Sequence, residues 1–396
     1  MTAGWRSMPL GELCQFQAGG AFPQSEQGHI VGDYPFIKVS DMTLPANSKR
    51  IVAANNWVTD ETAKRMKVKL APAGSVAFAK IGEGLKAERL RQITRPTAMD
   101  NNMMAAIPKR GSVDERFLLF LLESVRLSSW AEGSALPYLR QKDLAAIPVT
   151  VPSLPEQRDI SATLGTLDDK IESNLRSIDL IDQLVRARFD RDFDIEMSRT
   201  GTALSDLIDV NVRRKLSRGS EATYVGMSAL PEFSPTVYDW DIRAFGTGQK
   251  FVNGDVLMAR ITPCLENGKT AIVDMLDDGE VGWGSTEYIV LSPSGAFTTP
   301  WIYALARSDT LREWAIRRMT GSSGRQRFQA SGFDEYRIGE PSQQALSAFN
   351  SFAMPLFDRM TSLRDETRRL TALRDALLPE LLSGRISPTE LKGQSG

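Results

Sequence analysis

Apolar residues fall at alternating spacings of three and four along two long stretches of this chain. In the first stretch, residues 151–193, Asn174 interrupts an apolar series made of Ile160, Leu164, Leu167, Ile171, Ile178, Ile181 and Val185. The second stretch, near the C-terminus, repeats the spacing at Phe349, Ala353, Leu356, Met360, Leu363, Leu370 and Leu377. A narrow stripe with this rhythm is typical of helices that bury their seams against each other. We therefore predict two long helices that pair as a coiled coil.

The ends of both helices carry recognisable signals. Pro155 precedes "EQRD", which puts acidic residues in a first turn, where they oppose the positive end of the helix dipole. In the second stretch, "SGRI" follows Leu382, and Gly384 is expected to end the helix. The acidic pair Asp168–Asp169 is expected to be solvated on the surface of the first helix.

A strand pattern occurs twice, with an offset near 180 to 190 residues. "PFIKVSDM" (35–42) matches "TYVGMSAL" (223–230) in its apolar alternation and its shared Ser, and both are typical of short strands. "PAGSVAFAKIG" (72–82) matches "VNGDVLMARIT" (252–262), since each has a Gly turn and then an apolar strand. We interpret the chain as an internal duplication.

Basic and amide residues follow both copies of the pattern. Lys80 in the first copy and Arg260 in the second stand where the apolar strand ends. "AEGSALPYLRQKDL" (131–144) corresponds loosely to "MTGSSGRQRFQASGF" (319–333), each a Gly-Ser loop followed by basic and amide residues. These loops are the strongest candidates for a repeated binding surface.

The duplication and the two helices predict an α+β fold. Two similar mixed α/β domains, 1–150 and 201–338, would be separated by two long antiparallel coiled-coil helices within 151–200 and 339–390, which gives a pseudo-twofold internal repeat. The alternative is that each helix packs only on its own domain. Because the coiled-coil spacing occurs once after each copy, pairing of the helices is favoured.

The net charge of −1 argues neither for nor against a polyanionic partner. Residues 1–150 carry 19 Lys and Arg against 14 Asp and Glu, a net charge of +5, whereas residues 202–338 carry 15 against 17, a net charge of −2. The second copy would therefore need local clustering of cations to bind phosphates. No apolar run is long enough to span a bilayer and the first residues do not resemble a signal peptide, so we expect a cytoplasmic protein without membrane contact.

The usual catalytic constellations are not found. "LENGKT" (265–270) has the end of a phosphate-binding loop, but Pro263 stands where its first Gly is required. The single histidine, His29, excludes metal motifs that pair histidines, and Cys14 and Cys264 lack zinc-site spacing. The Asn-Pro-Pro-aromatic or Asp-Pro-Pro-aromatic tetrapeptide expected of an adenine methyltransferase is also missing. We predict a binding protein with no catalytic residues, cofactor or metal.

Two similar domains separated by a long helical spacer could recognise duplex DNA at two places. Each helix could run for 35 to 40 residues, roughly 50 to 60 Å, while half-sites one turn apart are separated by about 34 to 36 Å. Arg and Lys side chains prefer guanine, and Asn and Gln side chains prefer adenine. The two Gly-Ser loops therefore supply candidates for base contacts, and the basic run "NVRRKLSRGS" (211–220) supplies candidates for phosphate contacts. The predicted DNA-binding residues are Lys38, Ser40, Lys80, Arg140, Gln141, Lys142, Arg213, Arg214, Arg260, Arg325, Gln326 and Arg327.

The chain resembles the specificity subunit of type I restriction-modification enzymes over nearly its whole length. The resemblance is carried by "IPVTVPSLPEQRDI" with "LDDKI" after it, by "GSALPYLRQKDL" before it, and by "LRDALLPELLSGRI" (373–386). The second junction, "IGEPSQQALSAF", keeps Pro341 but lacks the Leu-Pro-Glu-Gln form.

This resemblance implies a non-catalytic subunit with two target recognition domains. It implies double-stranded DNA and two methyltransferase subunits as partners, and optionally two restriction subunits that act as motor and nuclease. Two alternatives stay open: a recognition module of another defence or modification system, which genome neighbourhood would identify, and a stand-alone enzyme, which S-adenosylmethionine or nucleotide binding would indicate.

Overall fold

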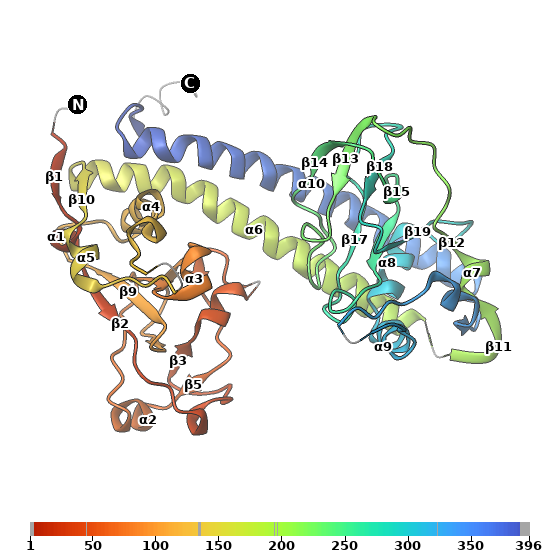
Figure 1. Cartoon of the computed structure of the whole chain (residues 1–396), viewed down its shortest axis with the longest axis horizontal. Helices are drawn as coiled ribbons and strands as arrows, with labels where there is room; N and C mark the ends of the chain where they lie inside the picture. Colours follow the sequence, from red (N-terminus) through yellow and green to blue (C-terminus); the bar gives the residue numbers. More distant parts are fainter. Residues whose placement is uncertain are drawn as a thin grey trace. The chain divides into compact units, whose positions relative to one another are not determined.

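The structure, a computed structural model, describes residues 4–44, 46–133, 136–193, 195, 197–322 and 324–388. The chain divides into two compact units: unit 1 is Met1–Ser173 with Arg369–Gly396, and unit 2 is Asn174–Arg368. Two long helices, α6 (Leu154–Asp192) and α10 (Gln343–Leu382), each contribute residues to both units (Figure 1). The predicted pair of long helices is confirmed, with ends close to those expected.

Unit 1 is built on mixed β-sheets. The main sheet has the order β2 (Cys14–Ala18), β9 (Met103–Pro108), β6 (Val76–Ala79), β7 (Leu90–Ile93) and β4 (Arg50–Ile51). A second sheet has the order β5 (Trp57–Val58), β3 (Tyr34–Ile37) and β8 (Ala98–Met99), and β1 (Arg6–Pro9) pairs with β10 (Pro148–Val151). Strand β6 is buried along its whole length, as expected for an apolar run at the centre of a sheet.

Short helices surround these sheets. They are α1 (Leu10–Leu13), α2 (Asp60–Arg65), α3 (Gly82–Lys86), α4 (Glu115–Val125) and α5 (Gln141–Ala146), with the 3₁₀ turns η1 (Gln24–Glu26), η2 (Val39–Thr43) and η3 (Leu127–Trp130). Asp114 caps α4, because its carboxylate accepts hydrogen bonds from the backbone N–H groups of Arg116 and Phe117. The apolar side of α4 enters the core of the unit beside Ile160 and Leu164 of α6.

Unit 2 repeats this plan. One sheet has the order β12 (Asp209–Val210), β19 (Tyr288–Ser292), β16 (Val256–Ala259) and β17 (Thr270–Ile272). Another has the order β14 (Asp241–Ala244), β13 (Glu221–Val225), β18 (Gly282–Gly284) and β15 (Gln249–Phe251), and β11 (Met197–Ala203) pairs with β20 (Arg337–Ile338). The shorter helices are α7 (Leu204–Leu207), α8 (Thr299–Arg307), α9 (Asp309–Arg317) and the 3₁₀ turn η4 (Ala330–Asp334).

The pairing of the strands confirms the internal duplication. Strand β6 lies antiparallel between β9 and β7, and β16 lies antiparallel between β19 and β17. Likewise, β3 runs parallel to β8 and β13 runs parallel to β18. The turns before β6 and β16 use Gly74 and Gly254, with φ of +86° and +91°, a conformation that favours glycine. The α+β fold with an internal repeat is therefore confirmed.

The long helices pair antiparallel within each unit. In unit 1, Arg374 of α10 donates to Asp168 of α6 at 3.2 Å, and Leu381 packs in the same core as Ile160 and Leu164. In unit 2, the ring centroids of Phe189 on α6 and Phe349 on α10 are 5.9 Å apart. Coiled-coil pairing is the observed arrangement, and each helix also packs on its neighbouring sheets and helices.

Two local expectations were wrong. Asp168 is 3% exposed, because Arg374 gives it a partner inside the seam, whereas its neighbour Asp169 is exposed as expected and also binds Arg116. The strand predicted for residues 35–42 ends at Ile37, because the buried Asp41 accepts the backbone N–H of Lys38 and closes a 3₁₀ turn. Its counterpart β13 ends at Val225.

Candidate nucleic-acid interface

In unit 1 the loop that closes the sheet domain is hydrogen-bonded to the end of strand β6. The backbone N–H of Leu139 donates to the carbonyl of Lys80 at 2.9 Å, and the N–H of Gly82 donates to the carbonyl of Pro137 at 2.8 Å. These bonds bring the backbone of Lys80 beside the closing loop. Ser134 and Ala135 of this loop lie outside the described residues.

Unit 2 has the same two hydrogen bonds at the equivalent positions. The N–H of Phe328 donates to the carbonyl of Arg260 at 2.8 Å, and the N–H of Thr262 donates to the carbonyl of Gln326 at 3.0 Å. The same contact between strand end and closing loop therefore exists in both copies. Arg327 occupies the position of Tyr138, because Ile261 pairs with Arg327 as Ile81 pairs with Tyr138. The basic runs of the two loops are therefore not aligned as their sequences suggested.

One carboxylate organises the cations in unit 2. Glu287 accepts hydrogen bonds from Nε of Arg327 at 2.9 and 3.0 Å and from its Nη2 at 2.7 Å, and one of 3.2 Å from Arg260 Nε. The hydrogen bonds from Arg327 hold the pKa of Glu287 below its usual value. These hydrogen bonds to Glu287 fix the orientation of both guanidinium groups. Because both groups are partly exposed, some of their N–H groups remain available to a ligand.

The tip of the unit 2 loop presents further side chains to solvent. Arg325 and Gln326 are exposed, while their backbone groups bond to the rest of the loop and to Thr262. Ser323, beside them, lies outside the described residues. Exposed side chains on a backbone that is held in place suit the reading of a ligand surface.

In unit 1 the closing loop holds Arg140. Its guanidinium lies 2.9 Å from the carboxylate of Glu132, donates to the hydroxyl of Tyr138 at 2.6 Å and lies over the Tyr138 ring. The arginine is exposed, so the ion pair is weak and can be exchanged for a phosphate.

Lys38 and Lys80 lie on either side of one short segment. Asp100 donates its N–H to the carbonyl of Ile37, and Asn102 accepts the N–H of Lys80 at its carbonyl. Burial raises the pKa of Asp100, and the charge of Lys38 opposes that shift. The ammonium group of Lys38 donates to Gln27 at 2.7 Å. Exposed Ser40 lies in the adjacent turn η2.

Four of the predicted residues are not brought to these strand ends. Gln141 and Lys142 begin α5 and line a different pocket with Cys14 and Lys109. In the 211–220 run, Arg213 is exposed. Nη2 of Arg214, by contrast, is surrounded by three acceptors: both oxygens of Asp255 at 2.7 Å and Ser292 Oγ at 3.1 Å.

The position of Arg214 favours a role in the fold. Asp255 is 1% exposed and precedes β16, whereas Arg260 follows it, so Arg214 lies at the opposite end of the strand from Arg260. Burial raises the pKa of Asp255, and the charge of Arg214 opposes this shift. No local pattern predicts this pair, because its partners are 41 residues apart.

Sequence reasoning also missed the residues that position the cations. Glu287, Glu132 and Asp100 were not singled out. Glu287 and Asn102 stand at matching places in the two copies, since each accepts the N–H of the strand-end basic residue at its carbonyl, but this match becomes visible only in the folded chain. Within the described residues, no group of acidic, cysteine and histidine side chains could hold a metal ion. No helix in the described part of the chain is long and apolar enough to cross a membrane.

Comparisons with known proteins give this geometry a family context. Residues 2–183 match the type I restriction modification DNA specificity domain. The specificity subunit of the type I restriction enzyme MjaIX from Methanocaldococcus jannaschii is 23% identical over 412 residues, covering 94% of this chain and 92% of that protein. The EcoEI specificity subunit from Escherichia coli is 31% identical over 144 residues, which are 35% of this chain and 24% of that protein.

A solved structure shares the fold. The crystal structure of the S subunit of a type I restriction-modification system from M. genitalium covers 96% of each chain, with a TM-score of 0.60 and 14% sequence identity. The domain match and the full-length relative agree with this shared fold. The chain is therefore similar over nearly its whole length to specificity subunits of type I restriction-modification enzymes, and its residues 2–183 match the DNA specificity domain found in such systems.

Proposed function

We propose that this chain reads an asymmetric DNA site in two halves, as the specificity subunit of a type I restriction-modification complex. The observation that carries the proposal is the repeated construction of the two interfaces. Both copies bind the closing loop to the end of a central strand with the same pair of hydrogen bonds, yet they present different side chains. Similar frames with different contacts suit two half-sites that differ in sequence.

The proposed DNA contacts are the exposed or partly exposed cations and amides at the strand ends. In unit 1 they are Lys38, Ser40, Lys80 and Arg140, and in unit 2 they are Arg260, Arg325, Gln326 and Arg327. Arg213, Gln141 and Lys142 remain candidates for phosphate contacts. Arg214 is left out, because its Nη2 is engaged by Asp255 and Ser292.

The paired helices would set the distance between the two recognition domains, 1–150 and 201–338, and carry the partners. Two repeated helical surfaces favour two copies of a methyltransferase subunit, by the pseudo-twofold symmetry of the repeat. Restriction subunits would join such a complex from outside. The chain itself would contribute recognition and no catalytic step.

The rival hypothesis is a recognition module of another modification system. The same two-copy interface would serve it, so the discriminating feature is the partner. Purification of the chain from cells together with its bound partners, and identification of the catalytic partner by mass spectrometry, separates the two hypotheses.

The decisive experiment is sequencing of methylated adenines in cells with the intact gene, without the gene, and with paired substitutions. Loss of the gene should remove one split motif. Arg325→Ala with Gln326→Ala should alter the second half of that motif alone, and Lys80→Ala with Arg140→Ala should alter the first half alone. Arg385→Ala, an exposed cation on the C-terminal side of α10, is the matched control that leaves both halves unchanged. A motif that survives deletion of the gene would refute the proposal.

A further inference from the structure

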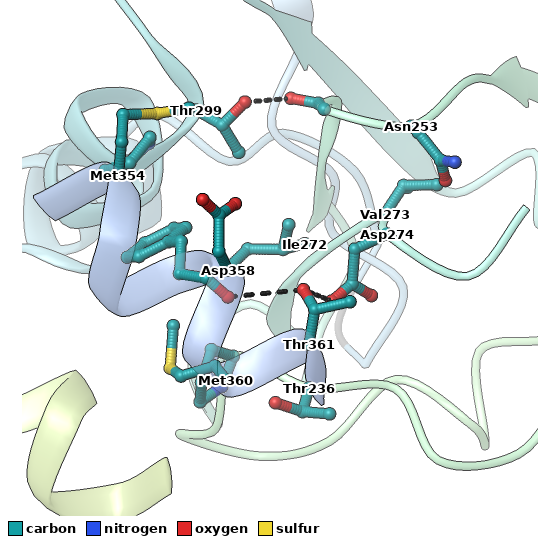
Figure 2. A pocket seen from close by; sticks show the side chains of 14 residues that line it. Thr236, Asn253, Ile272, Val273, Asp274, Thr299, Met354, Asp358, Met360 and Thr361 are labelled. Atoms are coloured by element: carbon teal, nitrogen blue, oxygen red, sulfur yellow. Dashed lines mark hydrogen bonds between the residues drawn. The ribbon is translucent and has the colours of Figure 1, made fainter. Parts of the chain in front are cut away.

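Unit 2 contains a pocket of about 210 Å³ beside α10. Thr236, Pro300, Met354, Asp358 and Asp274 are among the residues that line it (Figure 2). The side chain of Asp358 points into the pocket in Figure 2, and its carboxylate has no hydrogen bond or ion pair within the described part of the chain. Asp358 is exposed, so its carboxylate is solvated in the free chain and is accessible to a cation that enters the pocket.

The duplication identifies the equivalent positions in unit 1. Helices α6 and α10 begin at Leu154 and Gln343, an offset of 189 residues, and α4 and α8 begin at Glu115 and Thr299, an offset of 184. The two offsets place Asp358 at the position of Asp169, and Pro300 at the position of Arg116.

An independent contact supports this register. In unit 1, Ser161 of α6 donates to Asp114, the residue that caps α4, at 2.7 Å. In unit 2, Thr298, which precedes α8, donates to Asn350 of α10, also at 2.7 Å. The same two offsets relate both pairs, so the two helices meet in the same way in each copy.

In unit 1 the equivalent space is filled by guanidinium groups. Arg116 donates to both oxygens of Asp169 at 2.9 Å and to the carbonyl of Gly165 at 2.7 Å. Arg50 forms a second ion pair with Asp169. The hydrogen bonds from Arg116 hold the pKa of Asp169 below its usual value.

Both arginines are absent from unit 2. Pro300 replaces Arg116, and Thr236 replaces Arg50, since Thr236 pairs with Ile272 of β17 as Arg50 pairs with Gln92 of β7. Both replacements line the pocket. The second acidic residue there, Asp274, is already bound by Arg364 and Thr361, so Asp358 alone lacks its cation.

We propose that this pocket binds a guanidinium group, supplied by an arginine side chain of a protein partner. Unit 1 contains the equivalent contact within the chain, where the guanidinium of Arg116 donates to both oxygens of Asp169. At about 210 Å³ the pocket is smaller than the roughly 300–1,000 Å³ of small-molecule sites, which favours a side chain over a free metabolite. Met354, 41% exposed, lies at an opening that a partner on α10 could reach.

This inference rests on the proposed function, under which the partner on α10 is a methyltransferase subunit. It adds an asymmetry to that complex. At the unit 1 position the chain supplies its own arginine, whereas at the unit 2 position the partner would supply one. The two methyltransferase subunits would then be held by different contacts.

The first test titrates methylguanidinium into the purified full chain and follows binding by calorimetry. Asp358→Asn should weaken binding about tenfold, which is the effect expected of losing one charge-assisted hydrogen-bonded pair. Asp309→Asn is the matched control, because it removes an exposed carboxylate elsewhere in unit 2. Equal binding by the wild-type and Asp358→Asn chains would overturn the site.

A second variant fills the pocket from within. Pro300→Arg with Met354→Gly restores the residues of unit 1, where a Cβ at Gly165 would lie 2.5 Å from the guanidinium carbon of Arg116. This double variant should lose methylguanidinium binding and show a raised Tm relative to Met354→Gly alone. A double variant that still binds methylguanidinium as the wild type does would contradict the proposal.

The third test asks whether the methyltransferase subunit supplies the guanidinium group in the assembled complex. Asp358→Asn and the filled-pocket variant should each lower the affinity for the methyltransferase subunit about tenfold. If both variants bind that subunit as tightly as the wild type, the partner side chain is refuted, even where methylguanidinium binds. If the wild-type chain binds no methyltransferase, the proposed function fails, and the titration still decides whether the pocket binds guanidinium.

Discussion

The side-chain amide of Asn174 donates a 2.9 Å hydrogen bond to the carboxylate of Glu366 across the paired helices of unit 2. Asn174 is 1% exposed, at the position where it interrupts the apolar seam. A polar pair inside a coiled coil opposes other alignments of the helices, because any shift would bury the amide without its acceptor.

Asn174→Ala should therefore lower the free energy of unfolding by about 1.5–3 kcal/mol, the range for a hydrogen bond to a charged group. Urea denaturation of the full chain measures the change. Glu366→Gln keeps an acceptor for the amide and should cost less. Equal losses from the two variants would mean that the hydrogen bond is not the cause.

The Arg214–Asp255 pair gives a second prediction about stability. Removal of one partner of a buried ion pair leaves the other charge uncompensated, so Arg214→Ala should cost about 3–5 kcal/mol. Its exposed neighbour Arg213 is the matched control, and Arg213→Ala should change the unfolding free energy by less than about 0.5 kcal/mol. Denaturation of the two variants side by side decides whether Arg214 belongs to the fold or to the DNA contacts.

Much of the fold was predictable because its signals are periodic. The alternating spacing of three and four fixed both long helices, and the Gly turn before an apolar strand identified β6 and β16 in the two copies. Gly384, with φ of +67°, follows the end of α10 closely, as its residue type indicated.

Charges inside the structure were not predictable in this way. Asp168 was expected in solvent, but its partner Arg374 lies 206 residues away, and no local pattern connects them. The same limit applies to the interface, where Glu287 holds Arg327 from 40 residues away. Which polar residues are buried depends on partners that only the folded chain brings close.

Glu287 leads to a prediction about pH. Its pKa is lowered in the folded chain by Arg327, so its ion pairs contribute full stability above its ordinary pKa of 4.5. That contribution should be lost as the pH falls from 4.5 through the lowered folded value. Glu287→Gln should consequently be less stable than the wild type at neutral pH, and the difference should shrink on acidification. Denaturation midpoints measured at several pH values check this, and a difference that grows in acid would contradict it.

The last prediction concerns the helices as a spacer. One added heptad preserves the seam, because seven residues make two turns of a coiled coil, and it lengthens a helix by about 10 Å. Heptads inserted together after Ser173 in α6 and after Arg368 in α10 keep the pairs Asp168–Arg374 and Asn174–Glu366 intact, since each pair lies wholly to one side of both insertions. At about 3.4 Å per base pair, the methylated motif should keep both half-sites while its gap grows by about three base pairs. Insertion into α6 alone puts one of these pairs out of register and should lower the Tm. A matched insertion that leaves the chain folded and the gap unchanged would show that the paired helices do not set the distance between half-sites.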